Sequence, residues 1–135
     1  MAGEFLDSNI LVYAFTDDPR AGAAQALLER SCTISVQGLN EFVNVARRKL
    51  GKSWEEIRSD VAAIRVVCPA IVPIDVDIHE AALRLAERHG FAMFDALMIA
   101  AALQAGSTTL WSEDMQHGMV IDGKLRIVNP FRTVS

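Results

Sequence analysis

Short, nearly continuous apolar runs alternate along the chain with longer segments in which apolar residues recur at helical spacing. The short runs predict strands over residues 4–6, 33–36, 69–74 and 108–111, and either a hairpin or an irregular strand end over residues 120–128. The longer segments predict helices over residues 10–15, 21–30, 38–50, 53–67, 77–89 and 94–105. Strands that alternate with helices in this way favour an α/β fold, in which helices cover both faces of a mainly parallel sheet.

Several helix boundaries in this prediction rest on capping signals. Asp17-Asp18-Pro19 predicts the start of the helix over residues 21–30, because Asp favours the N-cap and Pro favours the first helical turn. Ser53 and Asp77 are each followed three residues later by Glu, which is the spacing of a capping box. Gly90 predicts the end of the helix that begins near Asp77.

The length and composition of the chain predict a single folded domain over residues 1–135. The chain is 51% hydrophobic and 22% charged, so it has ample apolar material for a core and too much for a disordered protein. The net charge of −4 gives the protein no long-range attraction for nucleic acid. Any binding of RNA or DNA therefore needs a local basic patch.

Cys32 and Cys68 lie outside any CxxC motif or Cys/His cluster, so we expect two reduced, semi-buried thiols. The N-terminal apolar stretch is too short for a signal peptide. The most apolar region, residues 90–106, is interrupted by Asp95 and has the length of a buried helix rather than a membrane span. These features predict a soluble cytoplasmic protein with no membrane partner.

Four acids in apolar surroundings form the candidate site: Asp7, Glu41, Asp95 and Asp114. Asp7 and Asp114 directly follow predicted strands, where sites form in parallel sheets. Converging carboxylates repel one another, and a divalent cation removes that penalty. Because all four ligands offer hard oxygen atoms, we expect Mg²⁺, with Mn²⁺ as a substitute, rather than zinc.

Each acid also has a simpler interpretation. Asp7 and Asp95 can serve as helix caps, Asp114 can cap a turn, and Glu41 can be an exposed residue of an amphipathic helix. Asp95 is hardest to explain in this way, because it is the single charge in the most apolar segment and unpaired buried charges are rare.

The chain resembles the PIN-domain family, and more narrowly the VapC-type toxins of type II toxin–antitoxin systems. The resemblance rests on the order and context of Leu6-Asp7-Ser8-Asn9, Asn40-Glu41-Phe42, Phe94-Asp95-Ala96-Leu97, Ser112-Glu113-Asp114 and Asn129-Pro130-Phe131. It implies a three-layer α/β/α sandwich with a mainly parallel sheet. It also implies catalytic and metal-binding roles for the four acids, supported by Asn9 and Ser112, with Glu113 as the nearest substitute for a further acid that some members carry.

The resemblance further implies a Mg²⁺-dependent endoribonuclease that acts as a toxin and hydrolyses RNA phosphodiesters through a metal-activated water. Its expected partners are a tRNA or rRNA substrate, a cognate antitoxin protein and a second copy of the chain. Arg47 and Arg48, on the predicted helix of Glu41, are candidate RNA-binding residues, although basic residues also favour a helix C-terminus as a solvated face. A non-catalytic PIN-like module that binds RNA or protein is the alternative, and cleavage of DNA stays open.

Overall fold

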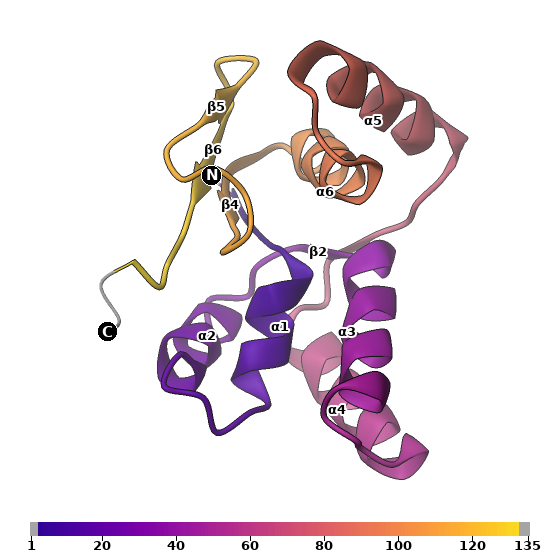
Figure 1. Cartoon of the computed structure of the whole chain (residues 1–135), viewed down its shortest axis with the longest axis vertical. Helices are drawn as coiled ribbons and strands as arrows, with labels where there is room; N and C mark the ends of the chain where they lie inside the picture. The colour runs from indigo at the N-terminus through magenta and orange to yellow at the C-terminus, as the bar shows by residue number, and fades with distance from the viewer. Residues whose placement is uncertain (1–2, 133–135) are drawn as a thin grey trace.

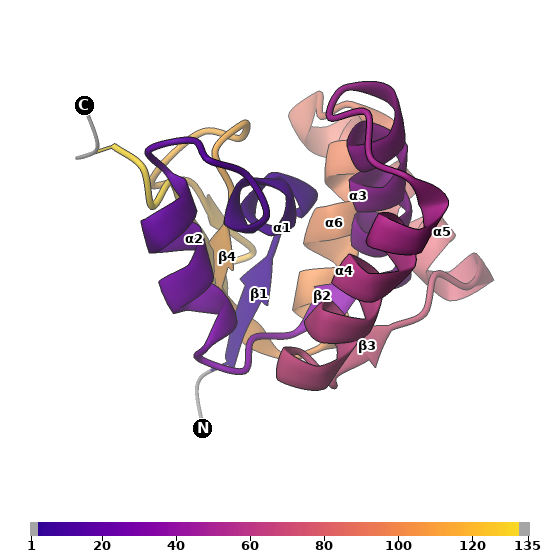
Figure 2. The same cartoon turned by 90° about the horizontal axis from the view of Figure 1, so that it is seen from below.

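The computed structural model describes residues 3–132 and confirms the predicted alternation of strands and helices. Figure 1 and Figure 2 show the arrangement of the elements in two views. In chain order they are β1 Gly3–Leu6, α1 Ser8–Ala14, α2 Ala21–Leu28, β2 Ile34–Ser35, α3 Val36–Arg48, α4 Trp54–Val67, β3 Ile71–Val72, α5 Val76–His89, α6 Met93–Gln104, β4 Ser107–Trp111, β5 Val120–Ile121 and β6 Leu125–Val128.

The central sheet is mainly parallel. Its four-stranded part has the order β1-β4-β6-β5, in which only β5 pairs antiparallel. The parallel pair β2-β3 joins this part through a parallel bridge between Phe5 and Thr33. The combined order is therefore β3-β2-β1-β4-β6-β5. Connections from β1 lead first to β2 on one side and later to β4 on the other, so the strand order reverses between β1 and β4.

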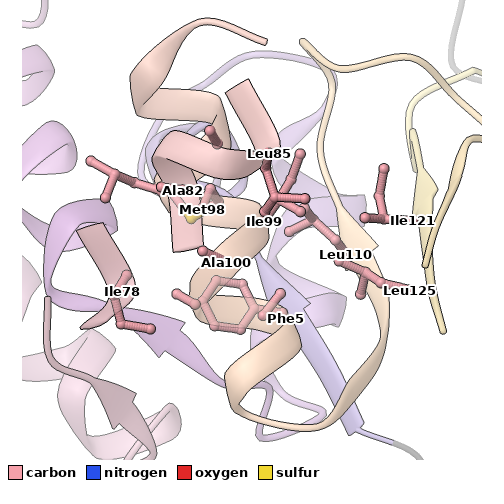
Figure 3. Close-up of a cluster of buried hydrophobic side chains, with 14 of the residues drawn as sticks. Phe5, Ile78, Ala82, Leu85, Met98, Ile99, Ala100, Leu110, Ile121 and Leu125 are labelled. Carbon is pink, nitrogen blue, oxygen red and sulfur yellow. The ribbon is translucent and has the colours of Figure 1, made fainter. Parts of the chain in front are cut away.

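Helices cover both faces of the sheet, as the sequence predicts for a three-layer sandwich. Adjacent residues of β1 point to opposite faces, with Phe5 in one buried cluster and Leu6 in the other. Phe5 packs with the buried sides of α5 and α6 and with the strands β4 to β6 (Figure 3). Leu6 packs with residues of α1, α2, α3 and α4, which lie on the other side of the sheet in Figure 1.

The helix α6 is the most buried helix of the fold. Seven of its residues are buried, from Ala96 to Ala102 without interruption. Several of them are alanines, whose small side chains allow close packing, and α6 packs against both α5 and β4. The prediction of a central, buried helix in this segment is thus confirmed, and the N-terminal end of that helix carries the residues Phe94 and Asp95.

Two helices begin at other capping residues than the sequence predicts. Ser35 accepts a 3.0 Å hydrogen bond from the Gly38 amide, so α3 begins at Val36 where a strand was expected. Asp75, rather than Asp77, caps α5. Asp77 lies instead in the first turn of α5, where a negative charge is favourable.

The segment before α2 also differs from its prediction. The Asp18 carboxylate accepts a hydrogen bond from the Arg20 amide and its carbonyl accepts one from Ala21. Asp18 therefore closes a turn, and Pro19 precedes the helix instead of occupying its first turn. The strand β3 is shorter than expected, because Pro73 follows Val72 and has no amide to continue a ladder.

Other local predictions are confirmed. Ser53 and Glu56 form the complete capping box of α4. The β5–β6 hairpin turns at Asp122 and Gly123, whose φ angles of 52° and 67° place both residues in the left-handed region. None of the helices described is long and apolar enough to cross a bilayer.

Candidate active site

Asp7 and Asp114 lie where β1 and β4 end side by side. The pairing of Leu6 with Trp111 aligns the two strand ends, and the Asp7 amide donates to the Trp111 carbonyl at 3.0 Å. This edge is also the point at which the strand order reverses, where parallel sheets leave a crevice. The topology thus brings together two acids that are far apart in the sequence.

Asp7 is a buried carboxylate with several hydrogen bonds. Its Oδ1 accepts from the Ser8 amide at 2.7 Å, which makes Asp7 the N-cap of α1 as well as a site residue. Its Oδ2 accepts from Ser112 Oγ at 2.7 Å. Burial raises the pKa of Asp7 to about 6 against the opposing effect of these hydrogen bonds, and the charges of Glu41 and Asp114 raise it further.

Glu41 and Asp95 reach the same place from two helices. Ser8 Oγ donates to Glu41 Oε2 at 2.8 Å, which links α3 to the residue that follows Asp7. Asp95 lies in the first turn of α6, and burial together with the charge of Asp114 raises its pKa. The interpretation of Asp95 as a plain N-cap is wrong, because Ala92 occupies the N-cap of α6.

The four predicted acids line one open hollow of about 470 Å³. Its wall also includes exposed or half-buried side chains of α3 and α6: Gln37, Asn40, Asn44, Val45 and Phe94. Four chain segments with no common local pattern thus place carboxylates around a single space, as the sequence predicted.

The donor set of this hollow fits a hydrated hard cation. Within residues 3–132, no three Asp, Glu, His or Cys side chains form a group that could by itself hold a metal ion. Mg²⁺ in proteins keeps several water ligands and binds directly to only one or two carboxylates, so it does not need such a group. Burial, and then the charges of neighbouring acids, raise the pKa values of Asp7 and Asp95, and a bound cation would oppose both effects.

Asn9 and Ser112 hold the acids in place. Asn9 Nδ2 donates to Asp7 Oδ2 at 3.3 Å and to Asp114 Oδ2 at 3.0 Å, so one amide group bridges two carboxylates. Asn9 Oδ1 accepts from the Glu113 amide at 3.3 Å and so contacts the loop after β4 as well. Ser112 is fully buried, and its hydroxyl is committed to Asp7.

A polar network beside Asp114 was not predicted from the sequence. Tyr13 donates its phenolic proton to Glu113 Oε1 at 2.6 Å, and Arg20 pairs with Glu113 Oε2 at 3.0 Å. Arg20 also lies over the Tyr13 ring, donates to its hydroxyl and pairs with Asp18 at 3.2 Å. Glu113 is therefore held away from the acids by α1 and the following loop.

The predicted basic patch at the end of α3 is divided in the structure. Arg47 lies 5.0 Å over the Trp54 ring and donates to the Lys52 carbonyl, so it faces α4 rather than the acids. Arg48 is exposed two turns beyond Glu41, on the same side of α3. Lys49, which follows these two residues in the sequence, lines a second hollow.

This second hollow of about 560 Å³ adjoins the first. Both are lined by Ser8, Val45 and Asp114, so they form one continuous depression across the end of the sheet. Its other lining residues are Asn9, Val12, Tyr13, Thr16, Asp18, Lys49, Leu50 and Glu113. The depression therefore has an acidic part between α3 and α6, and a mixed apolar and charged part over α1.

Structural comparison finds toxins with this fold. A toxin–antitoxin complex from Klebsiella pneumoniae is 21% identical, with a TM-score of 0.72 over 95% of this chain and 98% of that one. VapC20 from Mycobacterium tuberculosis, described as a sarcin–ricin-loop-cleaving toxin, is 21% identical, with a TM-score of 0.66 over 83% and 90% of the two chains. FitAB bound to a DNA fragment is 18% identical, with a TM-score of 0.68 over 95% of each chain.

At these identities the structural neighbours establish a shared fold. A search among curated proteins finds no match to the sequence. A sequence model of the PIN domain, however, matches residues 5–118, which include all four acids of the hollow. The chain therefore belongs to the PIN domain family.

Proposed function

We propose that the protein is a Mg²⁺-dependent endoribonuclease and the toxin of a type II toxin–antitoxin pair. The observation that carries the proposal is the convergence of Asp7, Glu41, Asp95 and Asp114 on one hollow at the end of the sheet. A non-catalytic binding module gains nothing from gathering four carboxylates around one hollow, where burial and neighbouring acids raise the pKa values of Asp7 and Asp95. Metal-dependent hydrolysis of a phosphodiester, in contrast, uses carboxylates to hold its cation.

The acids act in this proposal as ligands and as orienting groups. A bound divalent cation supplies an acidified water nucleophile and offsets the negative charge that develops on the phosphate. Asp7 is fixed by Ser112, Ser8 and Asn9, so it needs little reorganisation to bind a cation. Asp114 is more exposed and shares the Asn9 amide, which suits a ligand that contacts the cation through water.

The proposed partners are an RNA substrate, an antitoxin and a second copy of the chain. One neighbour is a toxin–antitoxin complex and another, VapC20, is a toxin, which supports an antitoxin partner for this chain. The first hollow adjoins a second hollow lined by Val12, Val45, Leu50 and Lys49. A protein segment that lies along both hollows would cover the acidic part and keep RNA from it.

The test is cleavage of end-labelled total tRNA and rRNA by the purified protein in Mg²⁺, Mn²⁺ or EDTA. Asp95→Asn and Glu41→Gln remove one charge each from the hollow, and Asp17→Asn removes one from an exposed turn as the matched control. We expect metal-dependent cleavage by the protein and by Asp17→Asn, and at least a hundredfold lower rate in the two site variants.

The ends of the products distinguish the mechanism. Attack by the metal-activated water, with the 3′-oxygen as the leaving group, gives a 5′-phosphate and a 3′-hydroxyl. Attack by the RNA 2′-hydroxyl expels the 5′-oxygen and gives a 2′,3′-cyclic phosphate and a 5′-hydroxyl. Cleavage that persists in EDTA, or in both site variants, would reject the metal-dependent mechanism. A protein that binds RNA without cutting it, and that shows no Mn²⁺ binding by calorimetry, would instead support the binding module.

A further inference from the structure

Phe94 is a large apolar side chain left in solvent at the edge of the acidic hollow. It is 63% exposed, although it belongs to the most buried helix of the fold. It lies directly before Asp95 and lines the same hollow as the four acids. The core does not require this ring, because the buried part of α6 begins two residues later at Ala96.

Amide side chains of α3 line the same hollow. Gln37, Asn40 and Asn44 recur along the side of α3 that also carries Glu41. Within residues 3–132 none of the three side-chain amides makes a hydrogen bond, so their donors and acceptors are free. Each amide group offers two donor hydrogens and one acceptor oxygen to a ligand.

The chemistry of these groups specifies a flat aromatic ligand with a polar edge. A phenyl face stacks on a planar ring, and amide groups pair with the donors and acceptors at the edge of that ring. A phosphate fits neither Phe94 nor the surrounding carboxylates without a cation. An unstacked nucleobase has both the required face and the required edge.

We propose that Phe94, with Gln37 and Asn44, forms a subsite for one unstacked nucleobase of the substrate, next to the phosphate that is cut. The inference rests on the proposed function and adds that the substrate is single-stranded at this position. In an RNA duplex the base faces are stacked and unavailable to a side chain. A base extruded from a loop can reach Phe94 while its phosphate stays beside Asp95.

Binding of fluorescein-labelled RNA, followed by anisotropy in Ca²⁺ buffer, tests the stacking role. The probes are a single-stranded oligonucleotide of mixed sequence, the same strand in a duplex, and a strand in which abasic sites replace the bases. Phe94→Ala removes the ring, Phe94→Tyr retains it, and Leu83→Ala is the control because Leu83 is similarly exposed on α5 and lines no part of the hollow. All of these positions are at the surface, so folding is retained.

We expect Phe94→Ala to weaken binding of the single strand roughly tenfold, since one base–aromatic stack contributes on that order. Phe94→Tyr and Leu83→Ala should bind like the unaltered protein. The abasic strand should bind the unaltered protein and Phe94→Ala equally. Unchanged single-strand affinity in Phe94→Ala, including the case in which Phe94 docks a protein instead, would overturn the inference.

The cleavage assay separates this inference from the proposed function. Cleavage with the same KM in Phe94→Ala and the unaltered protein would reject the subsite and leave the ribonuclease proposal standing. Loss of single-strand binding in Phe94→Ala, with no cleavage by the unaltered protein, would support the subsite and reject hydrolysis. A protein that neither binds nor cuts any single strand would reject both.

Discussion

Ser112 and Asp7 meet at the ends of β4 and β1, where Ser112 Oγ donates a 2.7 Å hydrogen bond to Asp7 Oδ2. Both side chains are buried, so water cannot replace this bond when it is removed. The bond favours the ionised carboxylate and opposes the effect of burial on the pKa of Asp7. Ser112 thus supports the residue that needs its charge in order to bind a cation.

Replacing Ser112 should therefore change the pH dependence of the site. We expect Ser112→Ala to raise the pKa of Asp7 further above its value of about 6, because the carboxylate loses its buried donor. The acidic limb of the rate–pH profile should then move to higher pH, and Mn²⁺ binding at pH 6 should weaken. Ser112→Thr keeps the hydroxyl and should behave like the unaltered protein. Identical profiles for the Ala and Thr variants would contradict a role for the hydroxyl.

Asp7 itself should reduce the stability of the metal-free protein at neutral pH. Its folded pKa of about 6 lies above the unfolded value of 3.8, so its contribution to stability is fully present below pH 3.8 and is lost as pH rises through 6. The loss is roughly 3 kcal/mol. In urea titrations with EDTA, we expect Asp7→Asn to raise the free energy of unfolding at pH 7.5 and to change it little at pH 4.

The control for this experiment is Asp17→Asn, since Asp17 is an exposed Asp that lies outside the hollow. Its unfolding free energy should follow that of the unaltered protein at both pH values. If Asp7→Asn lowered stability at pH 7.5, the hydrogen bonds of the carboxylate would outweigh the cost of burying its charge.

Two variants test whether Glu113 is a metal ligand or a residue that positions its neighbours. Tyr13 and Arg20 hold its carboxylate, and its backbone amide donates to Asn9, which contacts Asp114. We therefore expect Tyr13→Phe and Glu113→Gln to lower stability modestly, each by about 1 kcal/mol. Both variants should keep the Mn²⁺ affinity of the unaltered protein in calorimetry.

The result would differ if Glu113 were a ligand. In that case Glu113→Gln would lose Mn²⁺ affinity, whereas Tyr13→Phe would retain it or bind more tightly, because the freed carboxylate could turn toward the acids. Calorimetric titration of both variants at one pH decides between the two roles.

The divided basic patch predicts unequal effects on RNA binding. Arg48→Ala and Lys49→Ala should weaken single-strand binding, and each should lower the slope of log affinity against log salt by about 0.7 if it removes one phosphate contact. Arg47→Ala should leave this slope unchanged, because Arg47 stacks on Trp54 and donates to the Lys52 carbonyl. An equal loss of slope in all three variants would show that Arg47 leaves Trp54 when RNA binds.

Local sequence patterns predicted the order of the elements, but not every boundary. The Asp122-Gly123 turn and the Ser53 capping box depend on neighbouring residues, so they could be identified directly. Ser35 was missed as a cap because the β-branched Val36 follows it and favoured a strand, whereas Asp75 was missed because Asp77, with Glu80 three residues later, has the spacing of a capping box. Once the cap bonds form, the helix extends to include Val36 and Val76.

The four acids of the site could be identified from the apolar segments in which they lie. The side chains that contact them could not be identified in this way. Asp95 stands out because it is a charge in an apolar segment. The pairing of Tyr13 with Glu113 joins residues that lie a hundred positions apart and leaves no local signal. Phe94 appeared to belong to the core, since the pattern of α6 is apolar on every face and does not indicate which end of the helix is exposed.

The acidic hollow lies across the junction between the two parts of the sheet. The backbone joins them where Leu6 donates to the Thr33 carbonyl at 3.0 Å and Thr33 donates to the Glu4 carbonyl at 2.8 Å. Asp7 follows β1 on one side of this junction, while Glu41 belongs to the helix that follows β2 on the other side. The distance between these two carboxylates therefore depends on how the two parts of the sheet are joined. A single β-bulge introduced at Thr33 should change this distance while every acid of the site stays in the sequence.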